Sequence, residues 1–295
     1  MQIQDCFIKG DMKGAIEYMR CHEKYKEELP RYVALFEREQ YIHYDVPEPL
    51  GRILRAYQIY FRDVFYCQKP ETEAAETLLS SLQTLLDLAG ADEEQLAERM
   101  EPLFEANGYH AQFGKTQGYF GPYIWRETVP TVYTVELPFS TAKYTVNLLK
   151  GFVLRSWMAY LTFGRAGTGG WTLPDGTIQC IEEAYDFESE AFRVSLLKHE
   201  AQHAEDMKCY PDMTSPELEY RAKLVELCFS QNPELLSKFF VQADENRTND
   251  GHAIACVRIR REFEKMPPTE ISAIQTKARS LLAESNREMN AKYGK

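Results

Sequence analysis

Hydrophobic residues recur at intervals of three and four along the first hundred residues, which is the spacing of amphipathic helices. Four such stripes are present, and their apolar members are Ala15, Tyr18 and Met19; Tyr32, Leu35 and Phe36; Leu54, Tyr57, Phe61 and Val64; and Leu78, Leu79, Leu82, Leu85 and Leu86. The pattern therefore predicts a helical N-terminal region over residues 1–104.

The pattern changes after residue 104, where Tyr, Val, Thr and Phe become frequent and Gly and Pro interrupt them. The pattern predicts strands over Thr131–Leu137, Tyr144–Leu149 and Thr177–Ala184. It also predicts a buried helix over Phe152–Phe163. From Ser189 onward the periodicity is helical again. The order of helices, strands and helices predicts an α+β fold, with a second domain over residues 105–295.

Composition and charge narrow the class of protein. The 295 residues include 34 Lys and Arg against 45 Asp and Glu, a formal net charge of -11. This acidic balance argues against binding to nucleic acid, which needs clustered positive charge. Hydrophobic residues make up 44% of the chain, enough for a folded core, but no uninterrupted apolar run reaches the length of about 18 residues that a membrane span needs. We expect a globular protein that does not enter membranes.

The chain start and the cysteines indicate the compartment. The opening residues lack a basic segment followed by an apolar one, so we expect no secretory signal. The seven cysteines are odd in number and form no CxxC pair, which argues against a disulfide scaffold and a cysteine zinc knuckle. We therefore expect reduced cysteines and a cytoplasmic protein.

Residues 199–203, His199-Glu200-Ala201-Gln202-His203, form the pattern HExxH. Two histidines four residues apart lie on one face of a helix, so both imidazoles can reach one zinc ion. The glutamate beside the first histidine can then act as general base on a metal-bound water. The alternative without a metal is a helix whose two histidines contact a neighbouring element.

The flanking sequence supplies the helix that this motif needs. Ser189 is a suitable N-cap. Phe192, Leu196, His199 and His203 follow one another at helical spacing. Both histidines therefore continue the apolar face, where a metal would be shielded from water.

A third protein ligand is expected on the following helix. The first helix is predicted to end near Met207, and Ser215 with Pro216 opens the next one as N-cap and first residue. Because the connection is short, the two helices should be antiparallel, and Glu219 should face His203. Glu217 competes with Glu219, but its first-turn position already explains it as a cap. Cys209 is a weaker competitor.

The residues His199, Glu200, His203 and Glu219 together resemble the gluzincins, zinc metallopeptidases with HExxH on one helix and a glutamate ligand on the next. The resemblance implies a zincin-like domain after the helical N-terminal region, one zinc ion, and a peptide or protein substrate. Two features depart from the pattern: the interval before Glu219 is short, and Lys223 stands where thermolysin-like enzymes have an aspartate.

The resemblance also implies supporting groups. Asp206 could accept a hydrogen bond from a ligand imidazole, or be an ordinary solvated acid. An edge strand, expected at Thr177–Glu183, would pair with an extended peptide, and Trp171 would line the cleft or fill the core. A transition-state stabiliser is expected, for which the inward-pointing His252 is preferred over Tyr185 and Tyr220. The other histidines, His22, His43 and His110, receive no role.

The sequence thus predicts a zinc metallopeptidase with Glu200 as general base and His252 as a second catalytic residue. The alternative is a non-catalytic metal-binding or scaffold protein, whose helical N-terminal region would bind a protein partner. A fourth protein ligand such as Cys209 would favour that alternative, because a catalytic site keeps one metal position open.

Overall fold

The chain is described here from a computed structural model that covers residues 3–248, 250–267 and 269–293. The fold is mixed, with 56% of the residues in helices and 13% in strands, which confirms the expected α+β class. The chain divides into two compact units. Unit 1 comprises residues 1–127 and 151–168, and unit 2 comprises residues 128–150 and 169–295. The boundary expected after residue 104 falls inside unit 1.

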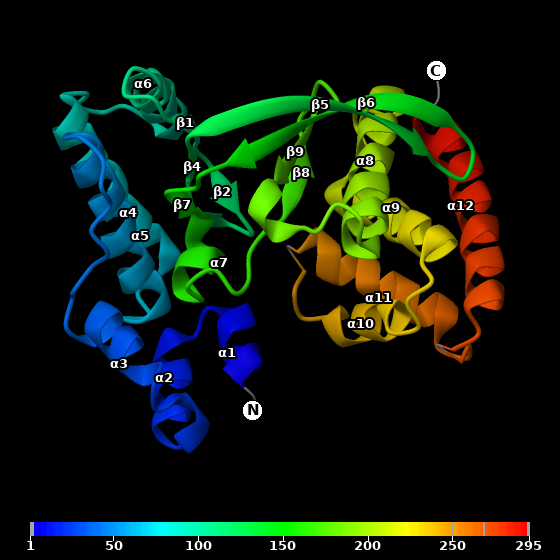
Figure 1. Cartoon of the computed structure of the whole chain (residues 1–295), viewed down its shortest axis with the longest axis horizontal. Helices are drawn as coiled ribbons and strands as arrows, with labels where there is room; N and C mark the ends of the chain where they lie inside the picture. Colours follow the sequence, from blue (N-terminus) through cyan, green and yellow to red (C-terminus); the bar gives the residue numbers. More distant parts are fainter. Residues whose placement is uncertain (1–2, 249, 268, 294–295) are drawn as a thin grey trace. The chain divides into compact units, whose positions relative to one another are not determined.

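Unit 1 is a helical body with short strands (Figure 1). Its helices are α1 (Ile3–Lys9), α2 (Met12–Arg20), α3 (Leu29–Tyr32), α4 (Leu50–Phe65), α5 (Glu71–Leu86), α6 (Glu93–Glu105) and α7 (Ser156–Leu161), with a 3-10 turn at Glu23–Tyr25 and a π-helical turn at Val33–Glu37. Its strands are β1 (His110–Gln112), β2 (Lys115–Thr116), β3 (Tyr119–Phe120), β4 (Tyr123–Trp125) and β7 (Leu154–Arg155). The four helices expected from the hydrophobic stripes are confirmed as α2, α3 with the turn after it, α4 and α5.

The helix expected over Phe152–Phe163 is only partly confirmed. Leu154 and Arg155 instead form β7, which pairs antiparallel with β4. The chain turns at Ser156, whose φ of 56° lies in the left-handed region, and helix α7 follows. Strand pairing with β4 therefore overrides the helical periodicity in the first part of this segment.

Unit 2 combines a four-stranded sheet with a group of helices (Figure 1). The strands are β5 (Glu127–Glu136), β6 (Thr141–Lys150), β8 (Gly170–Thr172) and β9 (Ile178–Ile181). The helices are α8 (Leu197–Cys209), α9 (Ser215–Phe229), α10 (Leu235–Gln242), α11 (Gly251–Phe263) and α12 (Ile271–Tyr293), with a 3-10 turn at Glu182–Ala184 and a π-helical turn at Ala191–Leu196. The expected strands before residue 150 are confirmed as β5 and β6.

The strand order in this sheet is β5-β6-β9-β8. Strand β9 is parallel to β6 and antiparallel to β8, with Trp171 opposite Gln179. The expectation that Thr177–Glu183 forms the edge strand is therefore wrong. The hydrophobic run at Ile178–Ile181 is buried inside the sheet, and the short strand β8 occupies the edge.

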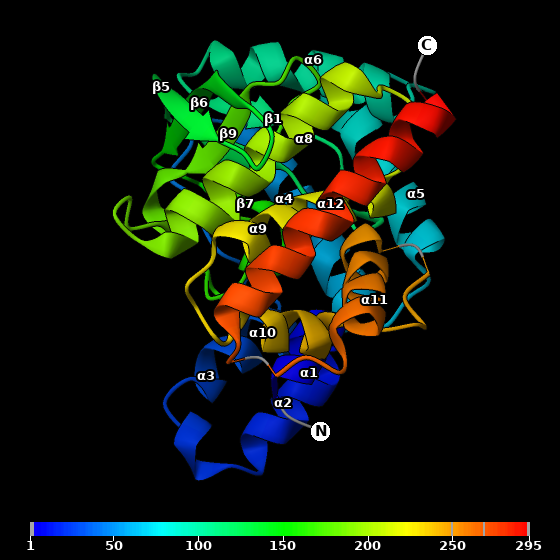
Figure 2. The ribbon, with the colours of Figure 1, turned by 90° about the vertical axis from the view of Figure 1, so that its right-hand side faces the viewer.

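Helix α9 is the central helix of unit 2. It packs against α8, α11 and α12, and Figure 2 shows α12 running alongside it. Residues 219–228 are all buried, so this part of α9 has no solvent-facing side. A helix buried on every side is expected to be apolar throughout. In this stretch α9 nevertheless carries four acidic or basic side chains, which are Glu219, Arg221, Lys223 and Glu226.

A buried ion pair joins α8 to α9. The guanidinium of Arg221 donates to both carboxylate oxygens of Asp206, at 2.8 and 2.7 Å, and also to Ser285 and Asn286 of α12. Gln202 donates to the same carboxylate at 2.8 Å. Both expectations for Asp206 are wrong, because it is neither solvated nor bound to an imidazole. It is 1% exposed and fixes the three helices together.

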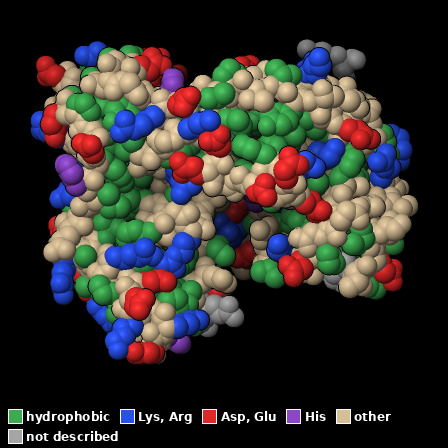
Figure 3. All heavy atoms as spheres, viewed as in Figure 1, with side chains coloured by type: hydrophobic (Ala, Val, Ile, Leu, Met, Phe, Trp, Pro, Cys, Tyr) green, Lys and Arg blue, Asp and Glu red, His purple; other side chains and the backbone are tan. Residues whose placement is uncertain are grey.

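The surface carries both signs of charge. Figure 3 shows Lys, Arg, Asp and Glu side chains interspersed across the displayed face. Within the residues that the structure describes, no helix has the length and apolar character of a membrane span.

The Asp206–Arg221 pair generates a stability prediction. Replacing Asp206 with Ala leaves a buried guanidinium without its counter-ion, so the free energy of unfolding should fall by about 3 to 5 kcal/mol. Urea denaturation followed by circular dichroism measures this change. The exposed residue Asp212 provides a control on the connection after α8, where Asp212→Ala should have little effect. A loss below about 1 kcal/mol for Asp206→Ala would contradict the structural role of the pair.

Candidate metal centre

The helix that carries the HExxH motif begins with a capped π-helical turn. The Ser189 hydroxyl accepts a hydrogen bond from the Phe192 backbone N–H at 3.2 Å, as its N-cap position predicts. The turn Ala191–Leu196 leads directly into α8. Phe192, Leu196, His199 and His203 are all buried, so the motif does lie on the core-facing side of the helix.

The second helix begins one residue earlier than predicted. Its N-cap is Thr214, not Ser215, and Thr214 forms a capping box with Glu217. The Glu217 carboxylate accepts hydrogen bonds from Thr214, from Lys292 at 2.7 Å and from the Tyr293 hydroxyl at 2.8 Å. Glu217 is therefore occupied as a cap, which removes it as a competitor for the metal.

Three side chains from α8 and α9 meet at one buried point. His199 Nε2 and His203 Nε2 are 3.0 Å apart, and each lies 3.5 Å from an oxygen of Glu219. The two helices are antiparallel, because the order of the contacts is reversed between them. Along α8, His199 comes before Asp206, whereas their partners on α9 are Glu226 and the earlier Arg221. The antiparallel arrangement and the proximity of Glu219 to His203 are as the sequence predicts.

The spacing of these atoms suits a tetrahedral metal ion. Ligand atoms about 2.0–2.1 Å from a tetrahedral zinc are roughly 3.3 Å from one another, close to the separations of 3.0 and 3.5 Å found here. Two imidazole nitrogens cannot present lone pairs to each other at 3.0 Å without repulsion, so a cation or proton must lie between them. Two imidazoles and a carboxylate are also a donor set that zinc accepts. The residues present therefore fit a zinc ion.

Electrostatics within the cluster favour positive charge at its centre. Burial alone would lower the pKa of His199, but hydrogen bonds and charge from Glu219 and Glu226 outweigh burial and raise it. Burial alone would raise the pKa of Glu219, but hydrogen bonds from His199, His203 and His252 outweigh it and lower the pKa well below its usual range. The carboxylates would thus stabilise a cation between the imidazoles.

Glu226 supports the first ligand, a role that the sequence reasoning missed. Its carboxylate lies 2.8 Å from His199 Nδ1 and is almost fully buried. An acceptor at Nδ1 keeps the proton on that nitrogen and leaves the Nε2 lone pair free for a metal. Glu226 lies seven residues after Glu219, two helical turns along the same face, and this spacing is the signal that could have identified it. His203 Nδ1, in contrast, is buried without a hydrogen-bond partner among the described residues.

His252 lies beside the cluster but is not buried. It is on the first turn of α11, which Asp250 caps, and its Nδ1 is 2.8 Å from Glu219 Oε2. Its side chain is 56% exposed, so the expectation that it points into the core is wrong. The ring lies parallel to that of His199, with centroids 6.4 Å apart. His252 therefore contacts the candidate ligand Glu219 and is also accessible to solvent.

Glu200 faces the edge strand. The Thr172 hydroxyl of β8 is 2.8 Å from Glu200 Oε2 and 2.9 Å from the Glu200 backbone oxygen, so its one proton is shared between them. Sequence reasoning did not identify Thr172, because the residue belongs to no motif. This contact fixes the carboxylate next to the strand at the edge of the sheet.

A glycine allows this strand to lie close to the helix. A Cβ atom at Gly170 would lie 2.5 Å from the Gln179 backbone oxygen and 2.5 Å from Leu196 Cδ1. Both distances are shorter than any normal contact. The approach of β8 to the turn before α8 therefore requires glycine at this position.

The other predicted site residues do not join the cluster. Cys209 is exposed, and its thiol is 4.0 Å from Glu205. Tyr220 is buried under the Arg258 guanidinium, whereas Tyr185 is half-buried against Phe192. The other histidines, His22, His43 and His110, all belong to unit 1. Among the described residues, three side chains thus form a group that could hold a metal ion, and they are His199, His203 and Glu219.

No family model, curated protein or solved structure matches this chain. The function must therefore be inferred from the residues and their geometry.

The first prediction from this geometry concerns metal content. The purified protein should contain one zinc ion per chain, measured by elemental analysis after dialysis. His203→Ala removes one of three ligands and should reduce the zinc content to a small fraction of that of the wild type. His43→Ala changes an exposed histidine in unit 1 and should retain the metal. Equal zinc content in all three proteins would exclude this site.

The second prediction concerns the support that Glu226 gives to His199. Glu226→Gln should weaken zinc binding by about 10- to 100-fold, because the imidazole loses its charged acceptor. Competition with a chromophoric chelator measures the affinity. Glu217→Gln makes the same change on the same helix but at the cap, and its zinc affinity should match that of the wild type. Equal affinities for the two variants would show that Glu226 does not act on the metal.

Proposed function

We propose that this protein is a zinc-dependent metallohydrolase of the gluzincin type, acting on peptides, and that unit 2 is a zincin-like domain. The observation that carries the proposal is the buried group of His199, His203 and Glu219, whose donor atoms are 3.0 and 3.5 Å apart. Three protein ligands leave a fourth position for water or substrate, as catalytic zinc sites do. A structural zinc site would instead need a fourth protein ligand, and Cys209 is exposed.

In this proposal the chain's own residues divide the work. Zinc, held by His199, His203 and Glu219, would supply Lewis-acid polarisation and would lower the pKa of a water. Glu200 accepts the proton of the attacking water at its carboxylate and passes it to the leaving amine. Thr172 is a positioning residue, because its hydroxyl holds Glu200 Oε2. His252, exposed beside Glu219, donates a hydrogen bond to the developing oxyanion.

Strand β8 would bind the substrate backbone. It is at the edge of the sheet, and its end at Thr172 contacts Glu200. An extended peptide that pairs with this edge would run past the general base, with main-chain hydrogen bonds supplying affinity. The peptide class of substrate rests on this adjacency between an edge strand and the motif.

Substitution of the general base tests the proposed reaction. Glu200→Gln should retain zinc but lower the rate of peptide cleavage by about 10²- to 10⁴-fold, because the amide cannot accept a proton. The rate is measured with a fluorescence-quenched peptide library and zinc-loaded protein. The wild-type activity should disappear with a chelator and return with zinc.

Glu205→Gln is the matched control, since Glu205 lies on the same helix and contacts Tyr144 and Cys209 instead of the cluster. It should keep the wild-type rate. Zinc-loaded wild-type protein that cleaves no member of the library, or Glu200→Gln protein with full activity, would refute the proposal.

A further inference from the structure

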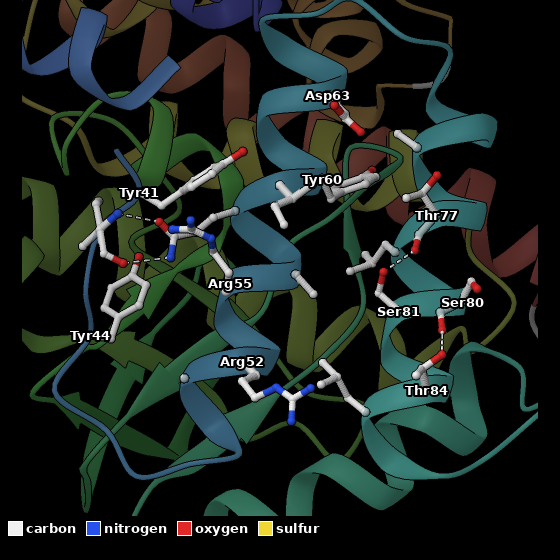
Figure 4. Close-up of a pocket in the computed structure, with 18 of the residues that line it drawn as sticks. Tyr41, Tyr44, Arg52, Arg55, Tyr60, Asp63, Thr77, Ser80, Ser81 and Thr84 are labelled. Carbon is white, nitrogen blue, oxygen red and sulfur yellow. Dashed lines mark hydrogen bonds between the residues drawn. The ribbon is translucent and has the colours of Figure 1, made fainter. Parts of the chain in front are cut away.

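Unit 1 contains a pocket that the proposed hydrolysis does not use. Its volume is about 660 Å³, within the range of roughly 300 to 1,000 Å³ typical of small-molecule sites. Helix α4 forms its floor, the segment of residues 41–48 forms one wall, and α5 forms the other (Figure 4). All three parts belong to unit 1.

The wall at residues 41–48 is fixed in place by a buried side chain of the floor. Gln58, 1% exposed, accepts a hydrogen bond from the Ile42 backbone N–H at 2.8 Å and donates one to the Ile42 backbone oxygen at 2.9 Å. The Tyr160 hydroxyl donates to the same Gln58 oxygen at 3.2 Å. The Gln58 amide thus bonds both backbone groups of Ile42, as a neighbouring strand would, and holds the segment in place. The pocket is therefore formed before any ligand binds.

Two arginines on the exposed face of α4 give the pocket its charge. The Arg55 guanidinium stacks on the Tyr41 ring at 3.6 Å from its centroid, and Figure 4 shows it between Tyr41 and Tyr44. Arg52, one turn earlier, extends toward α5 in the same view. Within the described part of the chain, neither guanidinium has a hydrogen-bond or ion-pair partner. Stacking orients Arg55 while leaving its N–H donors available.

The carboxylates that line the pocket do not neutralise these arginines. Asp63 is paired with Lys69 at 2.9 Å, and Glu48 makes no ion pair with either arginine. The lining holds two arginines and two carboxylates, and Lys69 neutralises Asp63, so one positive charge is left uncompensated when Lys69 is counted with the lining. A guanidinium with unused donors is the side chain best suited to a carboxylate or phosphate.

The remaining surface of the pocket is suited to an organic ligand. The hydroxyls of Thr77, Ser81 and Thr84 on α5 donate to carbonyl groups one turn earlier in their own helix, at 2.8 to 3.0 Å. They can therefore accept hydrogen bonds from a ligand but do not compete with the arginines for an anion. Ile59, 39% exposed, and Leu85 add apolar surface.

We propose that this pocket binds a small organic anion, with its carboxylate or phosphate at Arg52 and its apolar part over Ile59. The site is separate from the zinc cluster, and the proposal does not depend on the hydrolase activity. Carboxylate and phosphate share a negative charge that is delocalised over oxygen atoms. The probes below distinguish the two head groups.

Isothermal titration calorimetry of the full chain tests the proposal with three probes of the same size: 1-naphthyl phosphate, 1-naphthoate and the neutral 1-naphthalenemethanol. At least one anion should bind at one site per chain, and the neutral alcohol should bind at least about tenfold more weakly. Whether the phosphate or the carboxylate binds more tightly identifies the head group. Failure of both anions to bind at millimolar concentration would overturn the proposal.

Arg52→Ala should weaken binding of the anion by about tenfold or more, because a charged hydrogen-bond donor is lost. The variant should keep its fold, since the Arg52 guanidinium has no partner among the described residues. Arg99→Ala, an exposed arginine of α6 outside the pocket, is the control for net charge and should bind normally. Equal weakening by both variants would mean that the anion responds only to overall charge, which would overturn the site.

Hydrogen–deuterium exchange on the wild-type protein locates the ligand without any substitution. Binding should slow exchange in residues 41–48 and in α4. Protection confined to α8, α9 and α11 would place the anion at the metal cluster instead and overturn the proposal.

Discussion

Burial of ionisable side chains on α9 is the constraint on which the rest of unit 2 depends. Residues 219–228 have no exposed side, yet four of them are acidic or basic. A charge removed from water is costly unless it is paired and hydrogen-bonded. Each side chain has a compensating contact: Glu219 with the histidines, Arg221 with Asp206, Glu226 with His199, and Lys223 with the Phe239 ring at 4.7 Å. These contacts determine how α8 lies against α9.

The same constraint positions the side chains of the candidate metal cluster. His199 is held at Nδ1 by Glu226, and Glu219 is held by His252. One helical turn beyond His203, the Asp206–Arg221 pair fixes the same two helices and also contacts α12. The donor atoms are therefore arranged by the packing of unit 2 and not by a flexible loop. Such pre-organisation reduces the conformational entropy that these side chains would lose if an ion or a substrate bound.

Local signals in the sequence were sufficient for the four helices with hydrophobic stripes, for α8 and α9, for strands β5 and β6, and for the proximity of His199, His203 and Glu219. They rest on periodicity, capping and loop length, which act over a few residues. The features that sequence reasoning missed depend on pairing between distant segments. The edge strand could not be assigned, because the buried run at Ile178–Ile181 gives no information on which strand lies beside it. Asp206 was misjudged for the same reason, since its partner lies 15 residues away.

The close contact at Gly170 has a consequence for how this site can change. The distance between the edge strand and the motif helix is set by a residue without a side chain, through the 2.5 Å separations that any Cβ there would create. Adding a single methyl group would displace β8, and with it Thr172 and the hydrogen bond to Glu200. A protein could therefore keep every candidate metal ligand and the complete HExxH motif and still lose the alignment of the proposed general base. The motif is a necessary part of this site, but the spacing between β8 and the motif helix is encoded at Gly170, about thirty residues earlier in the chain.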